Sequence, residues 1–185
     1  HLGLISRLRG WPELLDALSL MQSDDLRLKV IGTFNDGSRT AFKTKAEELG
    51  LTDRITVIDW MPFKQAFAEL CSADIGLVLF QPCVQNHIYA LPHKLFDYML
   101  AELPVVVPAF AEEVASIVEQ EDCGFTVDPA DPSEIAQALD SLVGDDKVRT
   151  RFGKQGRRAV LERYNWETEA DKLIQMYAAL NGTES

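Results

Sequence analysis

The sequence predicts an α/β fold in which a mostly parallel sheet carries helices on both faces. Short apolar runs, several of them rich in Val and Ile, alternate with longer segments whose apolar residues recur at helical spacing. The joining segments are short, so each strand is expected to return to the same sheet through a helix. The 185 residues, of which 46% are hydrophobic and 25% charged, fit a single domain with a sizeable core.

The expected strands are short runs bounded by turn residues. A tight turn at residues 6–10 follows the first strand, and the turn chemistry of Asn35-Asp36-Gly37 lies in the loop after the second. In chain order the expected strands are Leu2–Ser6, Leu26–Ile31, Ile55–Ile58, Asp74–Phe80, Val105–Val107 and Gly124–Val127.

The expected helices each present an apolar face. Pro12 marks one start, because the first N–H groups of a helix lack partners in any case, and Gly50 marks one end. Ser133 is expected to cap another helix. The helices cover residues 12–21, Arg39–Leu49, Phe63–Cys71, residues 91–103, Glu112–Gln120, Glu134–Val143, Val148–Arg163 and Glu167–Leu180, and Asn181–Ser185 is expected to fray.

The stretch Tyr89–Pro108 organises the chain. The loop Gln81–Ala90 leaves the carboxyl end of an apolar strand and leads into a helix that starts at Leu91-Pro92. Open parallel sheets bind ligands at this edge, and the free N–H groups and dipole of a helix start favour phosphate. The stretch therefore predicts an anion site on a Rossmann-like sheet.

Composition narrows the function classes. The net charge of −11 argues against a general nucleic-acid or anionic-membrane surface. Three widely spaced cysteines suggest neither a zinc site nor a disulfide framework, so a reduced, cytoplasmic setting is expected. No signal peptide or membrane-length apolar run is visible. The chain starts at His1 within an apolar run, which suggests a fragment cut at a domain boundary.

Two motifs carry a family resemblance. Leu-Pro-His-Lys-Leu-Phe-Asp-Tyr-Met at residues 91–99, followed by Leu-Pro-Val-Val at residues 103–106, resembles the signature of the nucleotide-sugar-binding half of GT-B glycosyltransferases of family 4. Gly-Leu-Ile-Ser-Arg-Leu-Arg-Gly at residues 3–10 is similar to a second family motif near the start of the same domain. The resemblance covers nearly the whole chain. It implies the C-terminal half of a GT-B fold in a retaining enzyme that transfers a glycosyl group from a nucleotide diphosphate sugar.

The resemblance implies roles for two cations. Arg9 stands at the family's phosphate-binding position, and Lys94 lies at the start of the organising helix. Both are predicted catalytic residues, because a fixed cation stabilises the charge that develops on a diphosphate leaving group. A cation at a helix start is unfavourable unless an anion joins it. The alternative for each is a solvated side chain, and for Lys94 that alternative stands on equal terms.

Asp97 takes the place of the family's second acid, which accepts hydrogen bonds from the ribose hydroxyls. Tyr89 stands where the family has its first acid, which leaves the contacts to the donor sugar open. Base contacts are expected mostly from backbone near Gly32-Thr33 and after Trp60, which is itself expected in the core. The predicted substrate-binding residues are Gly3, Arg7, Met61, Pro62, Tyr89, Leu91, His93, Leu95 and Asp97.

The predicted partners are a nucleotide diphosphate sugar and an absent N-terminal domain that would bind the acceptor. A role in polysaccharide biosynthesis, with no metal or other cofactor, follows from the resemblance, and peripheral membrane association of the full protein stays open. Two alternatives remain: a nucleotide-sugar epimerase of GT-B type, and a non-enzymatic flavodoxin-like interaction domain. Receiver-type domains carry paired acids after the first strand, where this chain has Arg7 and Arg9.

Overall fold

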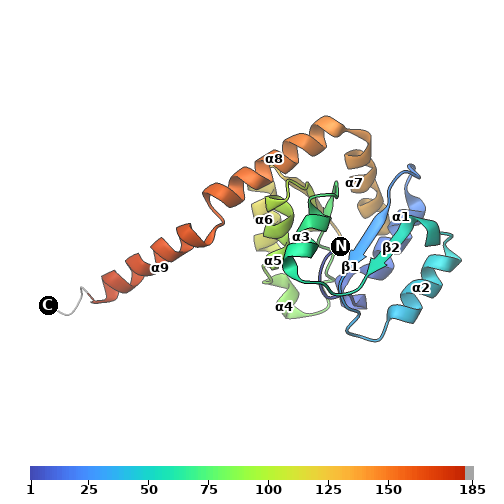
Figure 1. Ribbon diagram of the computed structural model, residues 1–185, viewed down its shortest axis with the longest axis horizontal. Helices are drawn as coiled ribbons and strands as arrows, with labels where there is room; N and C mark the ends of the chain where they lie inside the picture. Colours follow the sequence, from blue (N-terminus) through green and yellow to red (C-terminus); the bar gives the residue numbers. More distant parts are fainter. Residues whose placement is uncertain (182–185) are drawn as a thin grey trace.

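The computed structural model describes residues 1–181. Five strands and nine α-helices alternate along this part of the chain (Figure 1). The strands are β1 (Leu28–Ile31), β2 (Ile55–Ile58), β3 (Gly76–Leu77), β4 (Val105–Pro108) and β5 (Gly124–Val127). The helices are α1 (Trp11–Leu20), α2 (Arg39–Glu48), α3 (Phe63–Leu70), α4 (Gln85–Ile88), α5 (His93–Leu100), α6 (Glu112–Gln120), α7 (Pro132–Gly144), α8 (Asp146–Glu162) and α9 (Trp166–Asn181), with single 3-10 turns η1 (Arg7–Arg9) and η2 (Thr52–Arg54).

The strands pair in parallel, as predicted. They form two sheets: β1 pairs with β2 in one, and β4 lies between β3 and β5 in the other. The predicted first strand, Leu2–Ser6, is not a regular strand: it meets the β1 side of the sheet only through isolated bridges, Leu2 to Ile31 and Ile5 to Phe34. Gly3 adopts a φ of 103° between these bridges, which interrupts the extended backbone that a continuous ladder requires.

Helices cover both faces of the sheet. Successive side chains of a strand point to opposite faces, and in β4 they are buried on both. Val106 joins a cluster that contains Leu15 of α1 and Leu139 of α7. Val105 and Val107 join a second cluster that contains Met99 of α5 and Val114 of α6. The predicted α/β fold with helices on both faces is therefore confirmed.

Helix α8 packs closely on α5 through glycines. A Cβ atom at Gly153 would collide with the carbonyl oxygen of Glu102, just after α5, and one at Gly156 would press on Met99. Beyond α8, helix α9 projects away from the body of the molecule (Figure 1). Its apolar side chains are exposed, including Ile174 and Tyr177.

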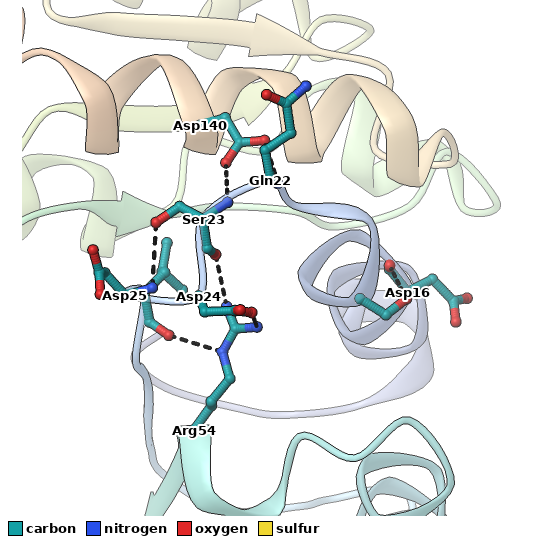
Figure 2. A network of polar contacts seen from close by, with 9 residues as sticks. Asp16, Gln22, Ser23, Asp24, Asp25, Arg54 and Asp140 are labelled. Carbon is teal, nitrogen blue, oxygen red and sulfur yellow. Dashed lines mark hydrogen bonds and ion pairs between the residues drawn. The ribbon is translucent and has the colours of Figure 1, made fainter.

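A polar network fixes the sheet at its amino edge (Figure 2). Asp140 of α7 accepts hydrogen bonds from the backbone N–H groups of Gln22 and Ser23, at 3.0 and 3.3 Å. Arg54 donates to the carbonyl oxygens of Ser23 and Leu26, at 3.3 and 3.2 Å. These bonds hold the loop between α1 and β1 in place at the amino edge of the sheet.

Two local predictions need correction. Asp131, not Ser133, caps α7, and its side chain accepts a hydrogen bond from the Ser133 N–H. Pro132 explains this, because proline favours the first position of a helix and so makes the preceding residue the cap. The loop 81–90 also contains the short helix α4, which sequence reasoning treated as loop. The expected fraying beyond residue 181 lies outside the described residues.

Candidate functional site

The candidate site lies at the carboxyl edge of the parallel strands. Four of the loops that leave the sheet there concern the site: residues 6–10 after the first segment, 32–38 after β1, 59–62 after β2 and 78–92 after β3. The third and fourth lead into the helices α3 and α5. Apart from Gly3, which lies in the first segment itself, the residues predicted to bind a ligand lie on these loops or on the helix that follows the last of them.

The turn that carries Arg9 is tightly constrained. Gly10 follows it with a φ of 77°, and a Cβ atom there would collide with the carbonyl oxygen of Leu79. The N–H of Gln81 donates to the carbonyl oxygen of Leu8 at 2.9 Å, which ties the turn to the loop after β3. Arg9 is half-buried. Arg7 is exposed and its guanidinium lies over the Trp11 ring, 5.2 Å from the ring centre.

Lys94 lies in the first turn of α5 and close to Arg9. The residue keeps part of its surface exposed, but burial of its ammonium group, together with the positive charge of Arg9, lowers its pKa to about 7. Within residues 1–181, no hydrogen bond or ion pair satisfies the side chain of either Arg9 or Lys94. Two neighbouring cations without an acid leave a local positive potential that favours an anion.

Backbone donors lie beside these cations. The N–H groups of His93 and Lys94, at the start of α5, find no acceptor in the described part of the chain, whereas the N–H of Leu95 donates to the carbonyl oxygen of Pro92 at 3.0 Å. Free N–H groups at a helix start are donors for an anion. The helix start therefore adds hydrogen-bond donors to the charges of Arg9 and Lys94.

Asp97 lies one turn further along α5. Its carboxylate is half-buried and accepts no hydrogen bond from the described residues. Burial raises its pKa, and the nearby His93 partly opposes that effect. A half-buried acceptor without a donor can receive hydroxyl groups of a ligand.

The other predicted contacts fall into two groups. Gly3 is exposed, and a Cβ atom there would meet nothing within 4 Å, so its glycine is required by the backbone φ and not by packing. Tyr89 and Leu91 are also exposed, with 69% and 40% of their surface accessible. Leu95 is fully buried in the core, so the prediction can hold only for its backbone.

The loop after β2 differs from the prediction at one residue. Trp60 was expected in the core, but 73% of its surface is exposed. Met61 is half-buried and Pro62 exposed. The carbonyl oxygen of Pro62 accepts from the Gln65 and Ala66 N–H groups at the start of α3, at 2.9 and 3.1 Å. Trp60 lies two residues beyond the end of β2 and is exposed, so the prediction from its hydrophobicity was wrong.

The buried residues His87 and Gln81 shape the loop before α5. His87 Nδ1 lies 2.7 Å from the carbonyl oxygen of Gln81, and its ring packs on Phe80 with the ring centres 5.0 Å apart. Gln81 Nε2 donates to the carbonyl oxygens of Leu79 and Pro129. Both side chains are satisfied inside the protein, so their role is to hold the loop.

A cavity of about 500 Å³ lies elsewhere, at the amino ends of β1 and β3, and is lined by Leu28, Thr56 and Ile75 among others. It does not include the predicted site residues, which lie on an open edge. Among residues 1–181, no three His, Cys, Asp or Glu side chains gather where they could hold a metal ion. No helix of the described chain has the length and hydropathy needed to cross a membrane.

Comparison with known proteins identifies the family. A family model for group 1 glycosyl transferases matches residues 2–159. The chain belongs to this family. The matched residues include both motifs, at residues 3–10 and 91–106, and the resemblance to GT-B glycosyltransferases is confirmed.

Individual relatives agree with this assignment. The phosphatidyl-myo-inositol mannosyltransferase of Mycobacterium leprae is 27% identical over 171 residues, covering 91% of this chain and 42% of the relative. Sucrose-phosphate synthase from Thermosynechococcus elongatus superposes with a TM-score of 0.82 at 21% identity, over 98% of this chain and 45% of that one. HepE from Anabaena, solved in complex with UDP, superposes with a TM-score of 0.80 at 18% identity, over 96% of this chain and 48% of that one. The chain therefore spans less than half the length of each.

Proposed function

We propose that this chain is the C-terminal, donor-binding domain of a retaining glycosyltransferase that uses a nucleotide diphosphate sugar. The observation that carries the proposal is the pair Arg9 and Lys94, two neighbouring cations without an acidic partner in the described chain, beside the free N–H groups at the start of α5. This arrangement suits a diphosphate. The UDP bound to the similarly folded HepE supports a nucleotide diphosphate as the ligand.

In this proposal the cations act on the leaving group. The bond between the sugar's anomeric carbon and the diphosphate oxygen breaks, and the diphosphate leaves with the electron pair. The acceptor hydroxyl oxygen forms the new bond to the anomeric carbon, and its proton passes to the departing diphosphate. Arg9 and Lys94 stabilise the negative charge that grows on its oxygens. Asp97 accepts hydrogen bonds from the ribose hydroxyls, and Gly3 lets the ligand approach the backbone closely. The acceptor hydroxyl binds to an N-terminal domain outside these 185 residues. A cytoplasmic location stays a prediction, to which the free thiols of Cys71, Cys83 and Cys123 conform.

The test compares two ligands. UDP, GDP and ADP are first screened by thermal shift, since a ligand that binds the folded state raises its stability. Calorimetry then compares the strongest diphosphate with its nucleoside. Arg9→Ala should weaken diphosphate binding about tenfold or more, as expected for a charge-assisted hydrogen bond, and leave nucleoside binding nearly unchanged. Arg27→Ala, at the opposite edge of the sheet before β1, is the matched control. Equal losses for both ligands would show that Arg9 is not a phosphate contact.

A further inference from the structure

Asp36 connects the loop after β1 to the turn that carries Arg9. Its Oδ2 accepts a hydrogen bond from the backbone N–H of Arg7 at 2.8 Å. Its Oδ1 accepts from the backbone N–H of Ser38 at 3.0 Å and from the Ser38 hydroxyl at 2.5 Å. One carboxylate thus joins two loops at the edge where the candidate site lies.

The far end of this connection is anchored in the core. The Ser38 hydroxyl accepts a hydrogen bond from Trp11 Nε1 at 3.0 Å, and both residues are buried. The Trp11 ring packs edge-on against Phe42 of α2, with the ring centres 5.5 Å apart. Because Ser38 is fixed by buried neighbours, the carboxylate of Asp36 has a defined position relative to the sheet.

At its other end, Asp36 contacts the turn η1, which has few hydrogen bonds of its own. η1 is a single 3-10 turn, closed by the bonds from the Arg9 N–H to Ser6 and from the Gly10 N–H to Arg7, both 3.0 Å long. Ser6 precedes the turn but makes no side-chain cap. Asp36, 29 residues away in the sequence, satisfies the first N–H instead. The orientation of this turn, and therefore of Arg9, depends on a partner from another loop.

A carboxylate at the edge of an anion site needs an explanation, because it repels a diphosphate. Three donors occupy the oxygens of Asp36. Burial alone would raise its pKa, but the Ser38 hydroxyl and the N–H groups of Arg7 and Ser38 outweigh it and lower the pKa below its usual range. The group is thus ionised at neutral pH, and its charge is used within the protein.

We propose that Asp36 is a positioning residue, which holds the turn at residues 7–9 so that Arg9 faces Lys94 and the diphosphate between them. This inference rests on the proposed function. It gives the acid at this positively charged site a role, which is to hold the turn. The first N–H of the turn then finds its acceptor in the loop after β1.

Three substitutions separate position from charge. Asp36→Ala removes the acceptor and is expected to weaken binding of UDP and of inorganic pyrophosphate about tenfold. Asp36→Asn removes the charge and keeps one acceptor oxygen, which can serve the Arg7 N–H or Ser38 but not both, so it should also lose affinity for both ligands, though less than Asp36→Ala. Asp36→Glu keeps the charge but shifts the oxygens by one methylene, and should lose affinity; it also serves if the alanine variant fails to fold. If the charge alone mattered, Asp36→Ala and Asp36→Asn would both bind more tightly.

A double-mutant cycle tests whether Asp36 acts through Arg9. In the Arg9→Ala background, Asp36→Ala should cause no further loss of affinity. Asp145→Ala is the matched control: this aspartate also accepts two backbone hydrogen bonds, from Lys147 and Val148, but at the start of α8. It should lower thermal stability without lowering affinity. Additive losses in the cycle, or tighter binding by the Ala and Asn variants, would overturn the inference alone. A wild-type chain that binds none of UDP, GDP, ADP and pyrophosphate would overturn the proposed function, and the inference with it.

Discussion

Arg9 and Lys94 lie close together in a protein whose net charge is −11. Nine of the 18 Lys and Arg side chains form an ion pair with an acid in the described chain, as Lys29 does with Glu69 at 2.6 Å. Like charges repel, so holding two unpaired cations close together destabilises the folded chain. A bound anion would offset this cost. At the residue scale, the candidate site is characterised by two unpaired cations that lie close together, one of them with a buried ammonium group.

The pKa of Lys94 predicts that UDP binding takes up a proton above neutral pH. In the free chain this pKa is about 7, and a bound diphosphate would raise it by favouring the ammonium form. Affinity for UDP should therefore fall as the pH rises above 7. Calorimetry at about pH 8, in two buffers with different heats of ionisation, measures the uptake. Lys94→Met should abolish it, and identical heats for the wild type in both buffers would contradict the prediction.

The same pKa also affects stability. The ordinary pKa of lysine is 10.5, so between 7 and 10.5 the unfolded chain binds more protons at this residue than the folded chain does. The contribution of Lys94 to the free energy of unfolding therefore rises with pH through this window and is least favourable below 7. Urea unfolding across the window should show a steeper rise for the wild type than for Lys94→Met.

Asp97 allows a test with a modified ligand. If its carboxylate holds the ribose hydroxyls, Asp97→Ala should cost roughly 1.5–3 kcal/mol of UDP binding, and Asp97→Asn less, because an amide oxygen still accepts. The wild type should bind 2′,3′-dideoxy-UDP weakly, and Asp97→Ala should no longer distinguish it from UDP. A mutant that keeps the full discrimination would leave Asp97 without a ribose role. Thermal unfolding of both variants should stay close to that of the wild type.

At the scale of the elements, Tyr98 locks α5 to the sheet. Its hydroxyl accepts a hydrogen bond from the Leu2 N–H at 2.8 Å and donates to the carbonyl oxygen of Leu77 at 3.4 Å. Its ring is fully buried against Gly76, where any Cβ atom would collide with it. The helix that carries Lys94 and Asp97 is thereby fixed to the segment that precedes Arg9.

Tyr98→Phe should therefore destabilise the fold. It removes one hydroxyl and leaves the Leu2 N–H without its partner, at an expected cost of about 1–3 kcal/mol in the free energy of unfolding. Urea denaturation measures this loss. Tyr177→Phe, which removes an exposed hydroxyl from α9, is the matched control and should change stability very little. Similar values for the two variants would show that the Tyr98 hydroxyl contributes nothing.

The order of strands and helices could be predicted, because apolar runs such as Val105–Val107 have a clear period and clear boundaries. The irregular first segment could not, because the positive φ of Gly3 depends on where the chain must turn. The motif residues were located by their resemblance to a family. The bond between Asp36 and the Arg7 N–H joins positions 29 residues apart, and such a pairing leaves no periodic signal in one sequence. Asn35-Asp36-Gly37 indicated only a turn.

At the scale of the whole molecule, the described chain has one densely packed body and a helix that leaves it (Figure 1). The apolar residues of α9, such as Leu173 and Ile174, are exposed, and so are Trp60 and Phe63 beside the candidate site. The chain covers 42% of the mycobacterial mannosyltransferase and 48% of HepE. These proportions support the proposal that donor binding and acceptor binding are divided between two domains.

The division predicts that residues 1–185 bind a nucleotide diphosphate but transfer no sugar. Transfer needs the acceptor hydroxyl held against the anomeric carbon, and correct placement of two reactants supplies much of an enzyme's rate. The chain should therefore bind UDP in calorimetry yet leave UDP-glucose, UDP-N-acetylglucosamine and GDP-mannose intact when the reaction is followed by chromatography. The UDP titration of the same preparation shows that the site is folded, so inactivity cannot be assigned to damaged protein. Turnover at about one per second or faster, by transfer or by hydrolysis, would mean that this domain alone contains the catalytic machinery.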